Sequence, residues 1–191
     1  MLTEPIAVTL LMVTALEKLG IPYFIGGSLA TAIHGVARAT MDVDLVADMR
    51  IEHADTLVQI LGDDFYADVE MIRDAIIHQH SFNVIHQETM FKVDVFIRKS
   101  RPFDQAQFER RRKYVLSEDP ERATYFATPE DNVLAKLEWY RMGGEVSDRQ
   151  WGDVLNVLKI QGERLDLDYL RKWAAELSVT DLLERAFREA R

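Results

Sequence analysis

The change of sequence pattern at Thr128 restricts the folds that this chain can adopt. Before it, short apolar or alternating runs separated by turns indicate strands that alternate with helices. Thr128 is followed by Pro129 and two acidic residues, which is typical of a helix start with a hydroxyl at the N-cap. Helical periodicity then continues to the end of the sequence. We therefore predict an α/β (α+β) fold, with an α/β lobe over residues 1–127 and a helical lobe over residues 128–191.

Hydrophobic periodicity predicts the order of helices and strands in each lobe. In the first lobe we expect helices over 3–19, 29–35, 51–61, 67–79 and 102–113, and strands over 21–25, 42–46, 82–86, 91–98, 114–116 and 124–127. In the second lobe we expect helices over 129–142, 147–161, 166–177 and 180–190. Ser28 is expected to cap the helix that starts at Leu29.

The composition is that of a folded protein without disulfides. Hydrophobic residues make up 48% and charged residues 29%, and there is no cysteine, which excludes thiolate nucleophiles and Cys-ligated zinc. Subtracting 32 Asp and Glu from 23 Lys and Arg gives a net charge of -9, so the chain as a whole repels nucleic acids and anionic membranes. No run reaches the roughly 18 apolar residues of a membrane span, and the N-terminal stretch has no basic leader. We expect a cytoplasmic protein that does not associate with membranes.

The histidines do not predict a metal site. None of the five has the spacing of a zinc ligand together with carboxylate support. His78 and His80 are two residues apart, so they cannot share a helix face, and we expect them at the boundary of an element. Any metal is therefore expected on carboxylates.

Two carboxylates occur on one predicted strand and a third on another. Asp42 and Asp44 are two residues apart, so both side chains project from the same face of the strand. Such a pair favours a cation, and its hard oxygen ligands suit Mg²⁺. Asp94 lies between valines in a second apolar strand, where an acid is costly without a partner. If the two strands are neighbours, the three carboxylates can hold two metal ions; the alternative is a solvated strand edge.

A glycine turn precedes this acidic pair. Gly26, Gly27 and Ser28 connect a predicted strand to a predicted helix. Backbone N–H groups at such a turn, with the positive end of a helix dipole, can bind a triphosphate. The sequence lacks the Gly-Lys-Ser/Thr of a P-loop and the spacing of a dinucleotide-binding fingerprint. The alternative is a purely structural turn.

The combination of these motifs resembles the nucleotidyltransferase superfamily, which includes DNA polymerase β and the aminoglycoside nucleotidyltransferases. It is most similar to the AbiEii-type toxins and the minimal bacterial nucleotidyltransferases. The family's four motifs appear in order: Gly27-Ser28 with Asp42 and Asp44, Lys92 with Asp94, Asp131 with Lys136, and Arg149 with Asp153. The resemblance implies a small mixed sheet flanked by helices, followed by the helical lobe.

The resemblance also assigns roles to these residues. Gly26, Gly27 and Ser28 would hold the phosphates of an NTP, and Asp42 and Asp44 would bind Mg²⁺. Asp94 would complete a second metal site or act as a base. Each role taken from the later motifs has a structural alternative.

Lys136 would lie near the triphosphate or the base, or else on a solvated helix face. Arg149 would orient Asp153 across the cleft, or the two would form an ordinary ion pair within a helix. Arg38, in the loop before Asp42, would contact a phosphate or the acceptor, or be a surface charge.

The predicted function is Mg²⁺-dependent transfer of an NMP from an NTP to a hydroxyl acceptor. The resemblance to toxins implies RNA, particularly tRNA, or a protein as the acceptor, and a possible antitoxin partner. The basic run over 98–113 could guide an RNA, or be a solvated helix face. The alternatives are a nucleotidyltransferase that modifies small molecules such as antibiotics, and a non-catalytic relative that binds a nucleotide or a partner.

Overall fold

The computed structural model describes residues 4–37, 39–40, 42–118 and 121–190. In this part of the chain, the expected α/β architecture with a mixed sheet is confirmed, and the strands follow the order β3-β4-β5-β2-β1-β7-β6 across one seven-stranded sheet. The elements divide into two compact units, and neither unit is a single continuous stretch of sequence. The first, the sheet unit, contains Met1–Gly26 and Ala39–Phe126, and the second, the helical unit, contains Gly27–Arg38 and Ala127–Arg191.

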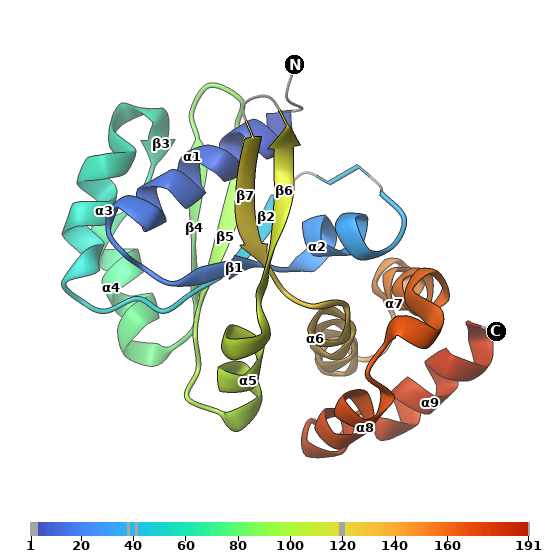
Figure 1. Ribbon diagram of the computed structural model, residues 1–191. Helices are drawn as coiled ribbons and strands as arrows, with labels where there is room; N and C mark the ends of the chain where they lie inside the picture. Colours follow the sequence, from blue (N-terminus) through green and yellow to red (C-terminus); the bar gives the residue numbers. More distant parts are fainter. Residues whose placement is uncertain (1–3, 38, 41, 119–120, 191) are drawn as a thin grey trace. The chain divides into compact units, whose positions relative to one another are not determined.

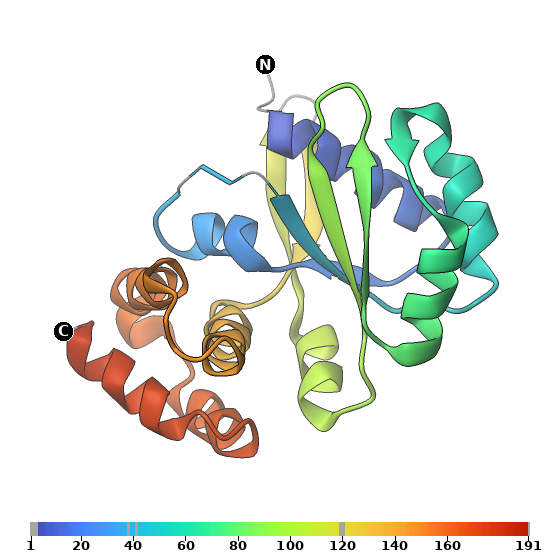
Figure 2. The ribbon, with the colours of Figure 1, turned by 180° about the vertical axis from the view of Figure 1, so that it is seen from behind.

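The sheet unit carries all the strands of the described chain and its N-terminal helices (Figure 1). Its strands are β1 (Tyr23–Ile25), β2 (Asp42–Ala47), β3 (Phe65–Tyr66), β4 (Ser81–His86), β5 (Lys92–Ile97), β6 (Arg112–Glu118) and β7 (Glu121–Phe126). Its helices are α1 (Glu4–Lys18), α3 (His53–Leu61), α4 (Val69–His78) and α5 (Pro102–Arg110). Helices α1, α3 and α4 pack beside one another along one side of the sheet (Figures 1 and 2).

The central strands β2 and β5 alternate between buried apolar residues and partly exposed residues, most of which are polar. In β2, Val43, Leu45 and Ala47 are fully buried, whereas Asp42 and Asp44 between them are partly exposed. Strand β5 shows the same alternation. Because successive side chains point to opposite faces of a strand, the apolar residues form the core on one face and the acids lie together on the other.

The predicted helix over 102–113 is wrong in its last turn. Helix α5 ends at Arg110, and β6 begins at Arg112, which pairs with Phe126 of the antiparallel strand β7. Arginine and lysine are good helix formers, so the local sequence favours a helix here. Pairing with β7 outweighs that preference, and the basic run is therefore split between a helix end and a strand.

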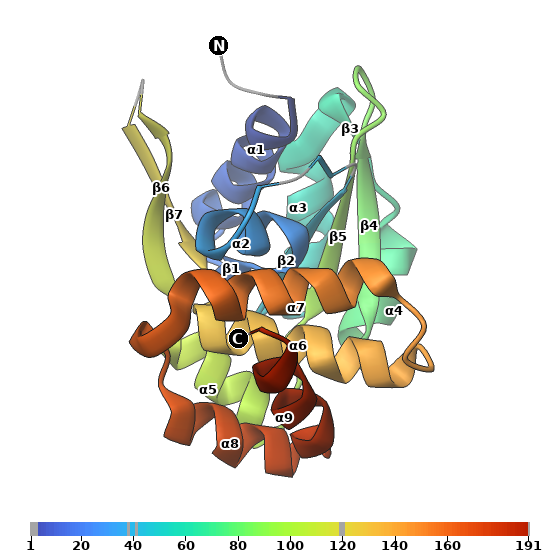
Figure 3. The ribbon, with the colours of Figure 1, turned by 90° about the vertical axis from the view of Figure 1, so that its right-hand side faces the viewer.

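The helical unit contains α2 (Gly27–His34), α6 (Pro129–Met142), α7 (Asp148–Gln161), α8 (Leu167–Glu176) and α9 (Thr180–Glu189), and its C-terminal helices are labelled in Figure 3. The predicted start of α6 is confirmed, because the Thr128 hydroxyl accepts a hydrogen bond from the Asp131 N–H at 3.3 Å. Within the described residues, no helix is long and apolar enough to cross a membrane.

Helix α2 belongs to the helical unit although its sequence lies far from the rest of that unit. It packs against α6 and α7. A Cβ atom at Gly35, just beyond its end, would lie 3.2 Å from the Thr31 carbonyl oxygen and 3.3 Å from Val157 of α7, so a side chain there would require these neighbours to move by a few tenths of an ångström. From its sequence we expect this segment in the first lobe, because its apolar pattern does not reveal which helices it contacts.

Candidate active site

The three strand aspartates come together through the pairing of β2 with β5. These strands are parallel neighbours, and Asp94 is aligned with Asp44 while Lys92 is aligned with Asp42. Neighbouring strands lie about 4.8 Å apart, and aligned residues share a face of the sheet. The expectation that the two acidic strands are neighbours is therefore confirmed by their register.

Lys92 and Thr40 contact the carboxylates of this acidic face. The Lys92 ammonium lies 2.7 Å from a carboxylate oxygen of Asp94, and the Thr40 hydroxyl donates a hydrogen bond of 2.9 Å to Asp42. The hydrogen bond to Asp94 raises the pKa of Lys92, and the charges of Asp42 and Asp44 add to the effect. The acidic face therefore already attracts and holds a cation.

The carboxylates are not gathered around one point in this arrangement. Within the described residues, Asp42, Asp44 and Asp94 do not form a group whose ligand atoms all lie within 4.8 Å of one another. Asp94 is bound to Lys92 and Asp42 to Thr40. A metal ion shared by the two strands would have to compete with the Lys92 ammonium for Asp94.

Asn83 is a polar neighbour that the sequence analysis did not identify. It lies on β4, aligned with Asp94 on the other side of β5. The sequence does contain a signal for this position. The predicted strands 82–86 and 91–98 form a hairpin, and continuing its pairing away from the turn aligns residue 83 with residue 94. The acidic face is therefore bordered by an amide on β4.

The glycine turn starts beside Asp44. The Gly26 N–H donates a hydrogen bond of 2.9 Å to the backbone carbonyl of Asp44. Helix α2 begins at the next residue, Gly27, whose φ of 54° is in the left-handed region that favours glycine. The prediction of Ser28 as the N-cap is wrong by two positions, because the helix begins at Gly27, which leaves Gly26 at the N-cap and Ser28 in the first turn.

In the helical unit, Lys136 and Asp153 form a buried ion pair between α6 and α7. The Lys136 ammonium lies 2.9 Å from an Asp153 carboxylate oxygen, and the two side chains are 10% and 4% exposed. The alternative of a solvated helix face for Lys136 is therefore wrong. Arg149 is exposed on α7, whereas Asp153 is bound to Lys136. Arg38, predicted to contact a phosphate, lies outside the described residues.

Two arginines of the basic run, Arg98 and Arg111, pack against aromatic rings of the sheet unit. The Arg111 guanidinium lies 5.3 Å from the centre of the Phe108 ring and 4.9 Å from that of Tyr125, and Arg98 lies 5.4 Å from Phe108. These residues, apart from Tyr125, line a cavity of about 290 Å³ with Pro22, Asp48, Gln105 and Glu109. Asp48 and Arg98 follow the C-terminal ends of β2 and β5, so the cavity is at the opposite end of these strands from Asp42.

Comparison with solved structures identifies the fold. The solution structure of the antibiotic-resistance factor ANT(2'')-Ia matches with a TM-score of 0.62 at 15% identity, covering 99% of this chain and 100% of that one. A nucleotidyltransferase-like protein from Paracoccidioides brasiliensis matches with a TM-score of 0.55 at 20% identity, covering 94% and 93%. The lincosamide adenylyltransferase LnuA matches with a TM-score of 0.51 at 15% identity, covering 83% and 98%. The chain thus has the nucleotidyltransferase fold.

Sequence comparison adds no further relative. No protein-family model matches the sequence, and no curated protein matches it.

Proposed function

We propose that this protein is a Mg²⁺-dependent nucleotidyltransferase that moves an NMP from an NTP to a hydroxyl acceptor and releases pyrophosphate. The observation that carries the proposal is the parallel register that aligns Asp94 with Asp44, with Asp42 on the same face. The fold shared with ANT(2'')-Ia and LnuA supports it.

Asp42, Asp44 and Asp94 are the residues that would hold the metal. Their carboxylates are hard oxygen ligands of the kind Mg²⁺ prefers. They also fit a cation, because the hydrogen bond to Asp94, together with the charges of the three carboxylates, already raises the pKa of Lys92. Bound divalent ions would lower the pKa of the attacking hydroxyl and neutralise the leaving pyrophosphate.

The glycine turn is proposed to bind the triphosphate. Gly26 is fixed beside Asp44 by its backbone hydrogen bond, and the first N–H groups of α2 follow directly in the chain. These groups and the helix dipole favour a phosphate at Gly27 and Ser28. Catalysis would then depend on positioning and charge neutralisation.

Further nucleotide contacts are proposed from the motif resemblance alone. It assigns Lys136, Arg149, Asp153 and Arg38 to the nucleotide or the acceptor. The buried pair formed by Lys136 and Asp153 means that these two residues would act as one unit.

The similarity to AbiEii-type motifs supports RNA, particularly tRNA, or a protein as the acceptor. On this proposal, the chain is a toxin with an antitoxin partner. A small-molecule acceptor is the second candidate. It is favoured by the fold likeness to ANT(2'')-Ia, solved in complex with adenylyl-2''-tobramycin, and to LnuA, solved with lincomycin bound.

Transfer of label from α-phosphate-labelled NTPs tests the proposal. The protein is incubated with each NTP, Mg²⁺ and, separately, total RNA, cell protein or a panel of aminoglycosides and lincosamides. We expect one acceptor class to be labelled by the parent and not by the Asp42→Asn or Asp44→Asn variants. Asp48→Asn is the matched control, because Asp48 pairs with Arg98 at the other end of β2. Absence of label with every NTP and acceptor would contradict the proposal and favour a non-catalytic relative.

A further inference from the structure

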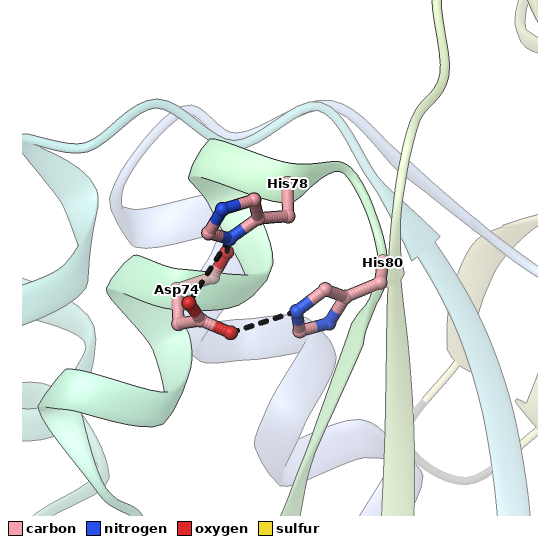
Figure 4. Close-up of side chains that lie close together, drawn as sticks. All are labelled: Asp74, His78 and His80. Atoms are coloured by element: carbon pink, nitrogen blue, oxygen red, sulfur yellow. Dashed lines mark hydrogen bonds and ion pairs between the residues drawn. The ribbon is translucent and has the colours of Figure 1, made fainter.

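A cluster of one carboxylate and two imidazoles lies where α4 ends and β4 begins. Helix α4 ends at His78, and Gln79 takes a left-handed conformation with φ 53° and ψ 44°. This turn directs the chain back over the last helical turn, so that His80 faces Asp74 from outside the helix (Figure 4). The prediction that His78 and His80 lie at an element boundary is confirmed. The turn at Gln79 also brings both rings to the Asp74 carboxylate, which their spacing in the sequence does not reveal.

Each imidazole contacts a different oxygen of the Asp74 carboxylate. His78 Nδ1 lies 3.0 Å from Oδ1 and 3.1 Å from the Asp74 backbone carbonyl oxygen, and His80 Nε2 lies 2.8 Å from Oδ2. An ion bound at His78 Nδ1 would replace the hydrogen that this nitrogen donates to the carbonyl oxygen. The two rings are parallel, with an interplanar angle of 4° and centres 6.0 Å apart. The side chains therefore converge on the carboxylate from one side, as Figure 4 shows.

The hydrogen-bond partners of His80 fix the role of each ring nitrogen. Its Nδ1 lies 2.9 Å from the Ser81 carbonyl oxygen, which can only accept, so Nδ1 carries the hydrogen. Nε2 lies 2.8 Å from a carboxylate oxygen of Asp74, and this short separation requires a positive group between the two atoms, either a proton or a metal ion. A ring whose second nitrogen donates to a backbone carbonyl is the usual arrangement of a metal-ligating histidine.

We propose that Asp74, His78 and His80 form a surface binding site for a divalent transition-metal ion of the Zn²⁺ type. Their ligand atoms all lie within 4.8 Å of one another. Bonds of about 2.0–2.1 Å in a tetrahedral site place ligand atoms roughly 3.3 Å apart. The separations from Asp74, 3.0 and 2.8 Å, are shorter, so these exposed side chains would move slightly apart around a bound ion. Two imidazoles and one carboxylate suit zinc better than magnesium, and three protein ligands leave one position for water.

This site is independent of the proposed active site. The two share no residue, and the strand aspartates offer only oxygen ligands. All three residues of the cluster are exposed, with side-chain exposures of 63% for His78, 49% for His80 and 58% for Asp74. An ion can therefore enter from solvent, and substitutions there leave the core intact.

Calorimetric titration of the full-length, tag-free protein with Zn²⁺ tests the site after treatment with a chelator. We expect the parent to bind one equivalent. Loss of even an outer partner of a metal ligand weakens binding by about 10–100-fold, so His78→Ala, His80→Ala and Asp74→Asn should each weaken it at least about tenfold. Co²⁺ in place of Zn²⁺ should give the visible absorption of a four-coordinate site in the parent only.

Two control variants make the result decisive. His53→Ala removes a histidine of the same unit outside the cluster, and the Asp42→Asn/Asp44→Asn double variant disables the proposed Mg²⁺ site; both should bind Zn²⁺ as the parent does. Far-UV circular dichroism verifies that every variant is folded. The proposal is overturned if the parent binds no Zn²⁺, if the His78 and His80 variants bind it as tightly as the parent, or if binding is lost only in the double variant.

Discussion

At the scale of single residues, Lys92 reduces the repulsion between the carboxylates of the acidic face when no metal is bound. Three carboxylates on adjacent positions of two strands repel one another, and the Lys92 ammonium is the cation in contact with Asp94. A strand lysine between apolar residues would ordinarily be taken as a surface charge. Lys92 contacts the acidic face because it is aligned with Asp42 and lies two residues before Asp94 on β5.

Replacing Lys92 by Met should therefore destabilise the protein most when Mg²⁺ is absent. Because the side chain is 43% exposed, we expect a loss of about 0.2–1 kcal/mol in the free energy of unfolding. Added Mg²⁺ should reduce the difference in stability between the parent and the variant. In the variant, Mg²⁺ binds the carboxylates without competing with the Lys92 ammonium. Urea denaturation with and without Mg²⁺ measures this, with Lys99→Met as the exposed control. An equal gap under both conditions would show that Lys92 and Mg²⁺ do not share a site.

His34 makes the stability of the helical unit depend on pH. Its Nε2 lies 2.7 Å from the Ala127 carbonyl oxygen, and burial lowers its pKa below the usual 6.5. His34 therefore binds a proton more readily in the unfolded chain than in the folded one. The contribution of neutral His34 to the free energy of unfolding is complete above pH 6.5 and is lost as the pH falls through the lowered pKa.

The free energy of unfolding, measured by urea denaturation at about pH 7.5 and about pH 5.5, should fall more for the parent than for His34→Gln. The Gln variant keeps an N–H donor for the Ala127 carbonyl and does not titrate. Equal pH dependence in the two proteins would mean that His34 is not responsible.

At the scale of elements, the sequence patterns of the strands predict the acidic face well, whereas the patterns of the helices do not show which elements the helices pack against. The alternation of Asp42 and Asp44 with apolar residues identifies β2, and the hairpin pattern identifies β4 and β5. That β2 and β5 are parallel neighbours follows from the topology of the sheet, which no local pattern records. β3 is only two residues long and has no sequence signal.

The ion pair of Lys136 and Asp153 joins two elements, and its role can be separated from its structural effect. Removing one partner leaves a buried charge, so Asp153→Leu should cost about 3–5 kcal/mol of folding stability. The double variant Lys136→Met/Asp153→Leu should recover most of that loss, because apolar residues can replace a buried pair.

Assaying nucleotide transfer with the double variant then distinguishes two roles. If the pair serves only to join α6 to α7, the stable double variant keeps the activity of the parent. If Lys136 contacts the nucleotide, as the motif resemblance predicts, activity is lost although the melting temperature is restored. The single variant alone would not separate these outcomes.

At the scale of the whole molecule, the chain crosses between its two units more than once. The predicted boundary after residue 127 is close to the later crossing, at Phe126 and Ala127, but the sequence does not show that residues 27–38 join the helical unit. That assignment depends on contacts distant in sequence, such as the hydrogen bond of 3.0 Å from Asn132 to Thr31. Local periodicity carries no information about such contacts.

A fragment that starts at Ala127 should accordingly fail to fold on its own. It lacks α2, which packs against α6 and α7, and so exposes apolar surface of both helices. We expect weak helicity and no cooperative thermal transition by circular dichroism. A synthetic peptide of residues 27–37 should restore the transition, and a scrambled peptide should not. Cooperative melting of the fragment alone would contradict this organisation of the chain.

Crystallising the full-length protein with a non-hydrolysable NTP and Mn²⁺, in place of Mg²⁺, tests the proposed active site most directly. The anomalous signal of manganese should appear on the carboxylates of Asp42, Asp44 and Asp94, with the Lys92 ammonium withdrawn from Asp94. The triphosphate should lie on the N–H groups that begin α2, at Gly27 and Ser28. A nucleotide bound elsewhere with no manganese on the strand aspartates would contradict the account.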